Sequence, residues 1–450
     1  MSVKTMLADH DVTAIIDQVL NAHTVYSATY AGEGTLHQPI HTVYGGAHLF
    51  TADTPKKLAS LALKSFETYA HDRAAFSNAM DLHQQPLATQ VYERLSRKLA
   101  AMPIEDLRID FEDGYGYRSD GEEDQHAINT GEAVAKARAS GTLPTYCGIR
   151  IKPLDRHAAK RAIRTLDLFI GSMRQAIGSP RLPTNFVVTL PKVMLPQQVK
   201  ALSKVLGTLE ERHRLERNSI KIELMIEQPQ AIIDKTGKCA LLDLVNAGEG
   251  RCRGVHFGAY DYTAACGVVA ADQRLDHPAC DFARNVMQIA LAQTGIWLSD
   301  GATTILPTPP YENTTTTSAL QKEENARVVH NAWRAHYKNV YRALQNGYYQ
   351  GWDLHPAQIP ARYAALYAFF LTSLPEMSKR LRVFMERAGR ASLVGDKFDD
   401  AATGQGLLNY FLRAADCGAI SQGDLIETGL TIEDMRIRSF SQILENRRKR

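Results

Sequence analysis

Several features that would assign this chain to a common protein class are missing from its sequence. It has no run of about 18 apolar residues, so we expect no membrane-spanning helix. The opening stretch MSVKTMLADHD has no basic part leading into an apolar segment, so we expect no secretion signal. The six cysteines include no CxxC pair, which argues against a zinc site or a disulfide framework and favours a reducing compartment. We therefore expect a cytoplasmic protein without a membrane partner.

Basic charge is also not concentrated anywhere in the body of the chain. The formal charge is only +3, and Lys and Arg are spread along the sequence, so we expect no nucleic-acid partner. A glycine-rich nucleotide loop is absent, which argues against the use of ATP. What is present is an ordinary globular composition, 44% hydrophobic and 22% charged, in 450 residues. Such a chain can form one large domain with a smaller one attached.

Short apolar runs alternate with longer amphipathic stretches along most of the chain. Eight runs are typical of strands buried on both faces: His41–Gly46, Leu107–Phe111, Tyr146–Ile151, Asn185–Leu190, Ile220–Ile226, Gly254–Gly258, Ile296–Ser299 and Tyr348–Leu354. Helical patterns lie between them, for example at Pro55–Ala70, His157–Ile177, Pro196–His213, Cys280–Gln293 and Leu320–Asn346. Eight strands, each followed by a helix, predict an α/β fold of the (β/α)₈ TIM-barrel type.

The chain continues after the eighth strand without a further strand-like run. We predict a barrel domain with an N-terminal extension over residues 1–372, and an appended helical subdomain over residues 373–450 that acts as a lid or in oligomerisation. Two connections, Asp113–Ile128 and Asp300–Ser318, are predicted as unusually long loops. Loops at the carboxyl ends of barrel strands are where such enzymes place substrate contacts.

Polar residues recur where the predicted strands end, which in a barrel is the active-site face. Glu227 follows the apolar run 224–226, and an isolated carboxylate there is costly unless it is paired or bound to a cation. Asp261 comes from the next strand end. Two such carboxylates suit Mg²⁺, and the absence of soft ligands disfavours zinc or copper. The alternative is a buried ion network in which Glu227 pairs with Arg150 or Lys192.

Other residues at this rim have chemistry that fits an anionic substrate. The guanidinium of Arg150 matches a carboxylate or an enolate oxygen, although it could equally bridge to Glu112 or Asp113. Lys192 could neutralise the same acids, stabilise an oxyanion or form a Schiff base, which would need no metal. Glu112 and Asp113 would orient metal-bound water molecules.

His355, which ends the eighth predicted strand, has three possible roles. It precedes Pro356, so its backbone is restrained to an extended form. The imidazole could contact substrate, act as a general acid–base or form a structural hydrogen bond.

Six short motifs resemble those of the HpcH/HpaI aldolase and citrate lyase β-subunit family. They occur in the family's order between about residues 40 and 360: Ile109–Asp113, Gly148–Pro153, Leu190–Val193, Leu224–Gln228, Phe257–Ala264 and Leu354–Ile359. The resemblance implies a barrel that forms trimers or hexamers. It also implies that the protein cleaves or forms a carbon–carbon bond next to a carbonyl group.

The resemblance also implies roles for individual residues. Glu227 and Asp261 would ligate Mg²⁺, with Mn²⁺ as an alternative, and Arg150 would contact substrate oxygens. Apart from the resemblance, we predict that Gly258 and His355 contact the substrate. Catalysis would rest on Arg150, Lys192, Glu112 and Asp113.

One departure from the family concerns the substrate. The C-terminal region lacks the DGKMID segment, which supplies an acid in the acyl-CoA lyases of this family, and only Asp399 and Asp400 are available as substitutes. Both a free oxo- or hydroxy-acid and its coenzyme A thioester therefore remain as substrate classes.

Three functions remain open from the sequence. The first is a Mg²⁺-dependent carbon–carbon lyase that acts through an enolate. The second is phosphotransfer or hydrolysis on a phosphoenolpyruvate-like substrate. The third is a protein that binds a dicarboxylate without turning it over.

Overall fold

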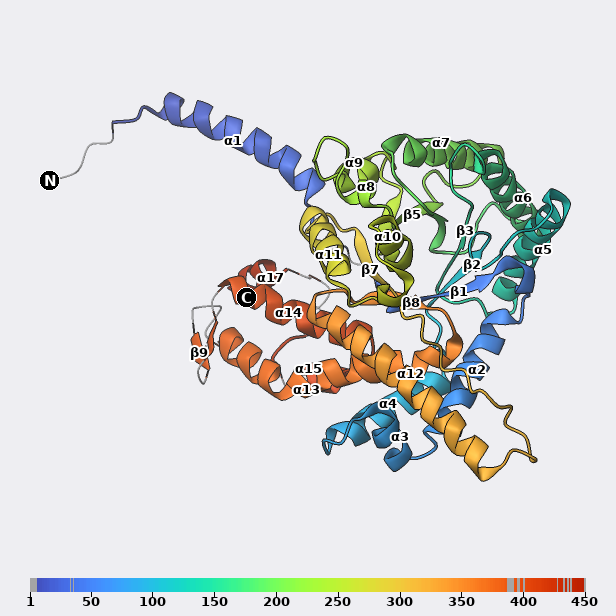
Figure 1. The fold of residues 1–450 in the computed structure, drawn as a ribbon. Coiled ribbons are helices and arrows are strands. Elements are labelled where there is room, and N and C mark those ends of the chain that lie inside the picture. The colour runs from blue at the N-terminus through green and yellow to red at the C-terminus, as the bar shows by residue number, and fades with distance from the viewer. Residues whose placement is uncertain are drawn as a thin grey trace.

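Eight parallel strands close into a barrel in the computed structural model (Figure 1). The structure describes residues 6–32, 34, 36–386, 392–394, 397–399, 401–426, 428–431, 434, 437 and 439–448. The strands are β1 (His41–Gly46), β2 (Asp106–Asp110), β3 (Tyr146–Arg150), β4 (Phe186–Leu190), β5 (Lys221–Ile226), β6 (Cys252–Phe257), β7 (Trp297–Ala302) and β8 (Gln350–Asp353). Each strand pairs with its sequence neighbours and β8 pairs with β1, so the predicted (β/α)₈ barrel is confirmed.

Helices cover the outside of the barrel between successive strands. They are α2 (Thr54–Tyr69), α5 (Asp120–Ala139), α6 (Ala159–Ile177), α7 (Pro196–Arg212), α8 (Pro229–Ile232), α9 (Leu241–Asn246), α10 (Ala259–Ala265), α11 (Pro278–Leu291) and α12 (Ala319–Gln345). Short 3₁₀ turns lie at η1 (Ala47–Leu49), η2 (Ala270–Asp272) and η3 (Pro356–Gln358). The apolar faces of the α-helices pack on strands that are buried almost throughout, which gives one continuous core.

One of the two predicted long loops is mostly helical. Helix α5 begins at Asp120, so only the first part of the segment 113–128 is a loop. Ser119 accepts the N–H of Glu122 while the Glu122 side chain accepts the N–H of Ser119, a capping box that starts the helix early. The second predicted loop is present between β7 and α12.

Additional helices form a layer on one side of the barrel. Helices α3 (Arg73–Met80) and α4 (Leu87–Ala100) are inserted between α2 and β2, and α4 packs against α13 (Ile359–Glu386). The layer continues with α14 (Ala401–Asp416), α15 (Gln422–Ile426) and α17 (Phe440–Arg448). Among the described residues, no helix combines the length and apolar character needed to cross a bilayer.

The C-terminal region differs from the sequence-based expectation in two respects. Helix α13 runs without a break through residues 372 and 373, where the domain boundary was predicted. Two short strands, β9 (Ser392–Val394) and β10 (Lys397–Asp399), form an antiparallel pair in a segment that was expected to hold no strand. Asp400 lies outside the described residues, and the division into two domains stays a prediction.

Helix α1 (Asp9–Thr29) projects away from the rest of the molecule (Figure 1). Every residue from Thr13 to Thr29 is exposed. After the helix, the backbone N–H of Gly32 donates to the carbonyl of Gln293 at 2.8 Å, which attaches this segment to the chain just beyond α11.

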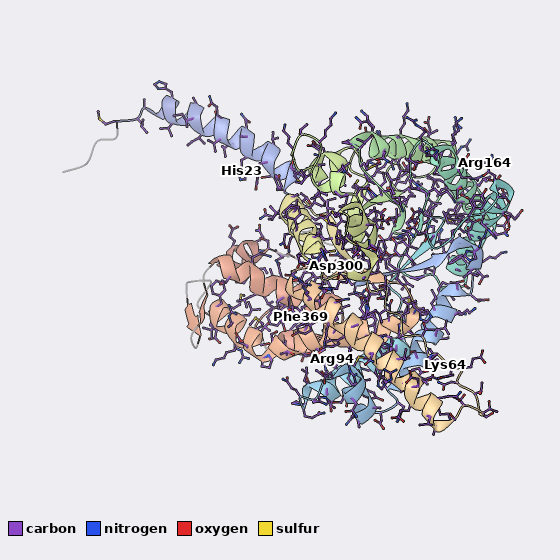
Figure 2. All side chains as sticks on the ribbon, in the orientation of Figure 1. His23, Lys64, Arg94, Arg164, Asp300 and Phe369 are labelled. Atoms are coloured by element: carbon purple, nitrogen blue, oxygen red, sulfur yellow. The ribbon has the colours of Figure 1, made fainter. Side chains whose placement is uncertain are left out.

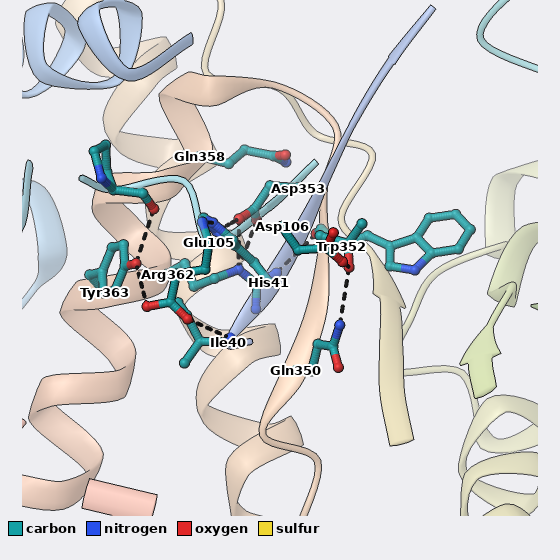
Figure 3. A network of polar contacts seen from close by, with 12 residues as sticks. Ile40, His41, Glu105, Asp106, Gln350, Trp352, Asp353, Gln358, Arg362 and Tyr363 are labelled. Carbon is teal, nitrogen blue, oxygen red and sulfur yellow. Dashed lines mark hydrogen bonds and ion pairs between the residues drawn. The ribbon is translucent and has the colours of Figure 1, made fainter. Parts of the chain in front are cut away.

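The first and last strands are joined by a buried polar cluster (Figure 3). Nδ1 of His41 on β1 lies 2.8 Å from Oδ2 of Asp353 on β8, and Nε of Arg362 on α13 donates to the same carboxylate at 2.8 Å. Nε2 of His336 on α12 lies 2.9 Å from Oδ1 of Asp353. Asp353 is completely buried, and Arg362 holds the pKa of its carboxyl well below the usual range despite the opposing effect of burial.

Candidate active site

A cavity of about 450 Å³ opens at the carboxyl ends of the barrel strands. Acidic and basic side chains lie on one side of it, among them Arg150, Glu227 and Asp261. Tyr44, Trp352 and other apolar groups also line it. This is the barrel face at which sequence reasoning placed the functional residues.

Arg150, the last residue of β3, is held by three acids at the end of β2, of which Asp110 is the last residue of the strand. Its Nε and Nη2 donate to the two carboxylate oxygens of Asp110 at 2.7 and 2.5 Å, and Nη1 lies 3.1 Å from Glu112. Asp113 is 3.8 Å away. The predicted bridges to Glu112 and Asp113 are therefore present, and Asp110 adds a two-point contact that fixes the guanidinium plane.

Lys192 reaches into the same acidic group from the end of β4. Its Nζ lies 2.5 Å from Glu112, 3.4 Å from Asp113 and 3.8 Å from Asp261. Burial alone would lower the pKa of Lys192, but the carboxylates of Glu227 and Glu112 outweigh it and raise that pKa above its usual value. The lysine is thus held protonated, which is unfavourable for a Schiff-base nucleophile.

The backbone at Lys192 is in the left-handed region, with φ of +49°. A residue with a Cβ rarely adopts this conformation and pays a cost of about 1 kcal/mol or more for it. In this conformation the backbone N–H of Lys192 donates to Oε1 of Glu227 at 2.6 Å. The strained turn therefore positions the glutamate as well as the lysine.

Glu227 is a buried carboxylate with more acidic than basic side chains around it. Its side chain follows β5 and the residue is only 1% exposed. The pKa of Glu227 is raised to about 8, chiefly by burial and also by the nearby acids Glu112 and Asp261, while Lys192 opposes them. Among the described residues, no hydrogen-bond donor reaches its Oε2. Such a group favours a cation as its partner.

The close packing of Glu227 depends on the glycine that follows β6. A Cβ at Gly258 would lie 2.5 Å from Cβ and 2.6 Å from Oε2 of Glu227. Three residues later, on α10, Asp261 faces the cavity and remains partly exposed. Gly258 is thus required to let the two carboxylates approach the same space.

The balance of charge in this region is strongly negative. Five carboxylates face two cations, which leaves a formal charge of −3: Asp110, Glu112, Asp113, Glu227 and Asp261 against Arg150 and Lys192. Within the described part of the chain, no three His, Cys, Asp or Glu side chains are grouped to hold a metal ion together. Glu227 and Asp261 nevertheless fit Mg²⁺, which takes one or two protein carboxylates and completes its shell with water or substrate oxygens.

Trp352 forms the aromatic side of the cavity and is fixed at two points. Its Nε1 donates to Nδ1 of His256 at 2.9 Å, and its carbonyl accepts from Nη2 of Arg362 at 2.9 Å. The guanidinium of Arg150 lies 5.0 Å from the ring centre of Tyr44 and 6.0 Å from that of Trp352. The aromatic rings therefore cover the arginine and leave an apolar wall beside it.

His355 does not line this cavity. Its Nδ1 accepts the backbone N–H of Ala357, which caps the short helix η3. Burial lowers the pKa of its imidazole. The structural hydrogen bond expected for His355 is therefore present, and its contact with substrate stays a prediction.

Three residues of the site were not selected from the sequence, namely Asp110, Tyr44 and Trp352. Asp110 lies inside the quoted motif Ile109–Asp113, but Glu112 and Asp113 were chosen instead. Asp110 shares with Asp106 and Arg108 the alternate positions of β2, all of which are buried. The sequence did contain a signal for Asp110: polar residues occupy every second position of this apolar strand, and such side chains point to the same face.

Comparison with known proteins gives a family and a fold. A family model described as "Domain of unknown function (DUF6986)" matches residues 19–443. No curated protein sequence matches the chain. A citrate lyase from Burkholderia xenovorans is similar in structure, with a TM-score of 0.57, 18% identity, and coverage of 88% of this chain and 97% of that one.

Two further solved structures are more distant. The CitE protein of Mycobacterium tuberculosis, solved with magnesium, acetoacetate and coenzyme A, has a TM-score of 0.48 and 15% identity, over 85% of this chain and 100% of that one. A malate synthase from Haloferax volcanii has a TM-score of 0.47 and 14% identity, over 92% and 99% of the two chains. At these identities the likeness concerns the fold.

Proposed function

We propose that this chain, which belongs to the DUF6986 family, is a Mg²⁺-dependent carbon–carbon lyase that acts through an enolate. The substrate class is a 2-oxo- or hydroxy-acid, free or as its coenzyme A thioester. The observation that carries the proposal is the buried carboxylate of Glu227 beside Asp261, in a cavity where acids outnumber bases. Burying an ionised carboxylate of this kind is costly unless a cation compensates its charge.

The metal, held by Glu227 and Asp261, would supply Lewis-acid polarisation of a carbonyl oxygen. Mg²⁺ is favoured, with Mn²⁺ as the alternative, because both ligands are hard carboxylate oxygens. Glu112 and Asp113 both contact Lys192, which places these acids beside the proposed metal site. From there they can orient water molecules.

Arg150 has the position of an electrostatic stabiliser of the enolate. When the carbon–carbon bond next to the carbonyl breaks, the electron pair stays with the substrate and negative charge develops on oxygen. A guanidinium already fixed by Asp110 needs no reorganisation to meet that charge. Lys192, held protonated by its acidic neighbours, adds a second positive charge at the edge of the site.

The apolar wall of the cavity would contact the part of the substrate that carries no charge. Tyr44 and Trp352 stand beside Arg150, so an acid whose carboxylate or carbonyl faces the arginine would place its carbon chain against these rings. The barrel shared with the Burkholderia xenovorans citrate lyase is compatible with this arrangement. The proposal itself rests on the side chains of this chain.

Metal binding is the first test. Titration calorimetry with MgCl₂, and electron paramagnetic resonance with MnCl₂, are expected to detect binding in the wild type and at least a tenfold loss in Glu227→Gln. Glu216→Gln is the matched control, because Glu216 is an exposed glutamate that precedes β5, whereas Glu227 follows it. Equal affinity in Glu227→Gln and the control would refute the metal site.

Activity is the second test. Cleavage is measured as pyruvate release from 4-hydroxy-2-oxo acids and as acetyl-coenzyme A release from 3-hydroxyacyl-coenzyme A thioesters, with and without a chelator. The lyase proposal predicts turnover that the chelator abolishes. Phosphate release from phosphoenolpyruvate without any lyase activity would favour phosphotransfer or hydrolysis, and binding without turnover would favour the dicarboxylate sensor.

A further inference from the structure

Helix α1 has an apolar stripe that nothing in the described chain covers. Five exposed apolar side chains form this stripe, Ile15 60%, Ile16 46%, Val19 61%, Leu20 57% and Tyr26 54%, while Val25, 72% exposed, lies on the opposite face. They recur at the three- and four-residue spacing that gathers side chains on one face of a helix. The opposite face carries mostly small or polar residues, such as Gln18 and Asn21.

This helix projects from the molecule along its whole length (Figures 1 and 2). The side chain of His23 marks the middle of the projecting part in Figure 2. A 21-residue helix is about 31 Å long, and most helices of this kind are stable only when a face packs on another element. We therefore expect α1 to be covered by a partner.

A second apolar stripe lies on α11, close to where α1 is attached. Phe282 is 55% exposed and Ile289 79% exposed, with the half-buried Val286 between them. These residues are four and three positions apart, so they share one face of α11. The N–H of Gly32 donates to the carbonyl of Gln293, which places the root of α1 beside the end of this helix.

We propose that α1 is an arm that two copies of this chain exchange, each arm packing on the α11 stripe of the other copy. A two-fold axis makes such a contact reciprocal, because each chain offers one arm and one stripe. Helices α1 and α11 lie on the same side of the molecule (Figure 1). Pairing of the two arms with each other would leave Phe282 and Ile289 bare.

The apolar area is close to what a stable dimer needs. The five apolar residues of the arm and the two most exposed residues of the stripe expose on the order of 100 Å² each. One chain therefore offers roughly 700 Å², compared with roughly 800 Å² that each partner buries in a specific interface. The charge of the arm disfavours a lipid surface, since residues 9–29 contain three Asp and no Lys or Arg.

Solution mass tests the proposal on the full chain. Light scattering after size exclusion is expected to give the mass of a dimer, or an even multiple, for the wild type. The double variant Ile16→Asp with Val19→Asp should halve that mass, and so should Ile289→Asp. The control, Gln18→Asp with Asn21→Asp, adds the same two charges to the opposite face and should leave the mass unchanged.

Three outcomes would overturn the exchange. They are a monomeric wild type, an unchanged mass in the arm variant, or an unchanged mass in Ile289→Asp, which would mean that the arm packs elsewhere. Circular dichroism of every variant should be that of an intact barrel, because all the substituted side chains are at least partly exposed.

Cross-linking separates exchange from folding back within one chain. Val19→Cys is combined in turn with Phe282→Cys, Val286→Cys and Ile289→Cys, and each double variant is oxidised and run on a non-reducing gel. Exchange predicts a covalent dimer in at least one combination. An internal disulfide in a monomer, or no bond in any combination, contradicts it. Each single variant measures the background from the native exposed Cys239 and Cys266.

Discussion

The backbone of Gly258 and the carboxylate of Glu227 are in direct contact, since a Cβ at Gly258 would lie 2.6 Å from Oε2. Gly258 directly follows β6 and Glu227 directly follows β5, two adjacent strands of the barrel. The glycine is therefore a steric condition for the position of the glutamate. Its φ is negative, so the requirement comes from space and not from backbone conformation.

Gly258→Ala should displace the Glu227 carboxylate and weaken metal binding by 10- to 100-fold, because second-neighbour contacts orient metal ligands. Gly121→Ala is the matched control, since a Cβ there meets nothing within 4 Å. Titration of both variants with MnCl₂ measures the effect. If both variants bind Mn²⁺ as tightly as the wild type does, the contact between Gly258 and Glu227 does not affect metal binding.

The stability of the metal-free protein should fall as pH rises from about 4.5 to about 8. Burial raises the pKa of Glu227 to about 8, so in this window the unfolded chain has lost a proton that the folded chain retains. The loss is on the order of 5 kcal/mol, since the pKa rises from 4.5 to about 8 and each pKa unit corresponds to about 1.4 kcal/mol. Urea denaturation of the wild type and Glu227→Gln across this range should show a larger fall in the wild type, because other carboxyls whose pKa burial raises, such as Glu112, titrate in both proteins.

Mg²⁺ should reverse this loss at pH 8, because it binds the ionised carboxylate of the folded state alone. The same denaturation with and without MgCl₂ measures it. Identical pH profiles for the wild type and Glu227→Gln would rule out the raised pKa.

Arg150→Lys should reduce kcat/KM by about 100-fold, because an ammonium cannot reproduce the two-point contact with Asp110 that fixes the guanidinium in the site. Arg164→Lys offers a matched control, as Arg164 makes a similar two-point contact with Asp124 on the surface. Steady-state kinetics on a substrate identified by the panel compare the two. A variant that keeps half of the wild-type kcat/KM would remove Arg150 from the catalytic site.

Borohydride reduction in the presence of pyruvate should leave Lys192 unmodified. Glu227 and Glu112 raise the pKa of this lysine despite its burial, and a protonated amine does not form a Schiff base. Mass spectrometry of the peptide that contains Lys192 provides the readout. A reduced pyruvate adduct on this residue would replace the enolate mechanism with covalent catalysis.

Asp353→Asn should destabilise the fold by about 3 to 5 kcal/mol, since it leaves the guanidinium of Arg362 buried without its counter-charge. Asp272→Asn, at an exposed site, should change stability by less than about 0.5 kcal/mol. Denaturant titration measures both. A small effect at Asp353 would mean that solvent reaches the cluster.

Much of the fold could be predicted because periodicity and burial agree in this chain. The predicted strand His41–Gly46 coincides with β1, and the other seven strands lie within a few residues of the predicted ones. The start of α5 was missed because the acidic run after Ser119 was taken for a loop. In the structure that run forms the first turn of a helix, where acidic side chains are favoured.

From the sequence, the candidate site could be predicted only as a group of residues located at the ends of strands. The structure brings Glu112, Asp113, Arg150, Lys192, Glu227, Gly258 and Asp261 together, while their roles stay predictions. Tyr44 and Trp352 were missed because both lie in strands buried on both faces, where the sequence does not show which face points into the barrel. His355 was selected by its motif, which cannot distinguish a helix cap from a substrate contact.

The pairing of β1 with β8 has a consequence for how the chain is made. The residues that join these strands, His41 and Asp353, are 312 positions apart, and Arg362 lies nine positions further on. A ribosome must therefore release most of the polypeptide before the barrel can close. Until then the open edges of β1 and of the newest strand are unpaired and prone to association, so nascent chains of this protein should depend on protection by chaperones.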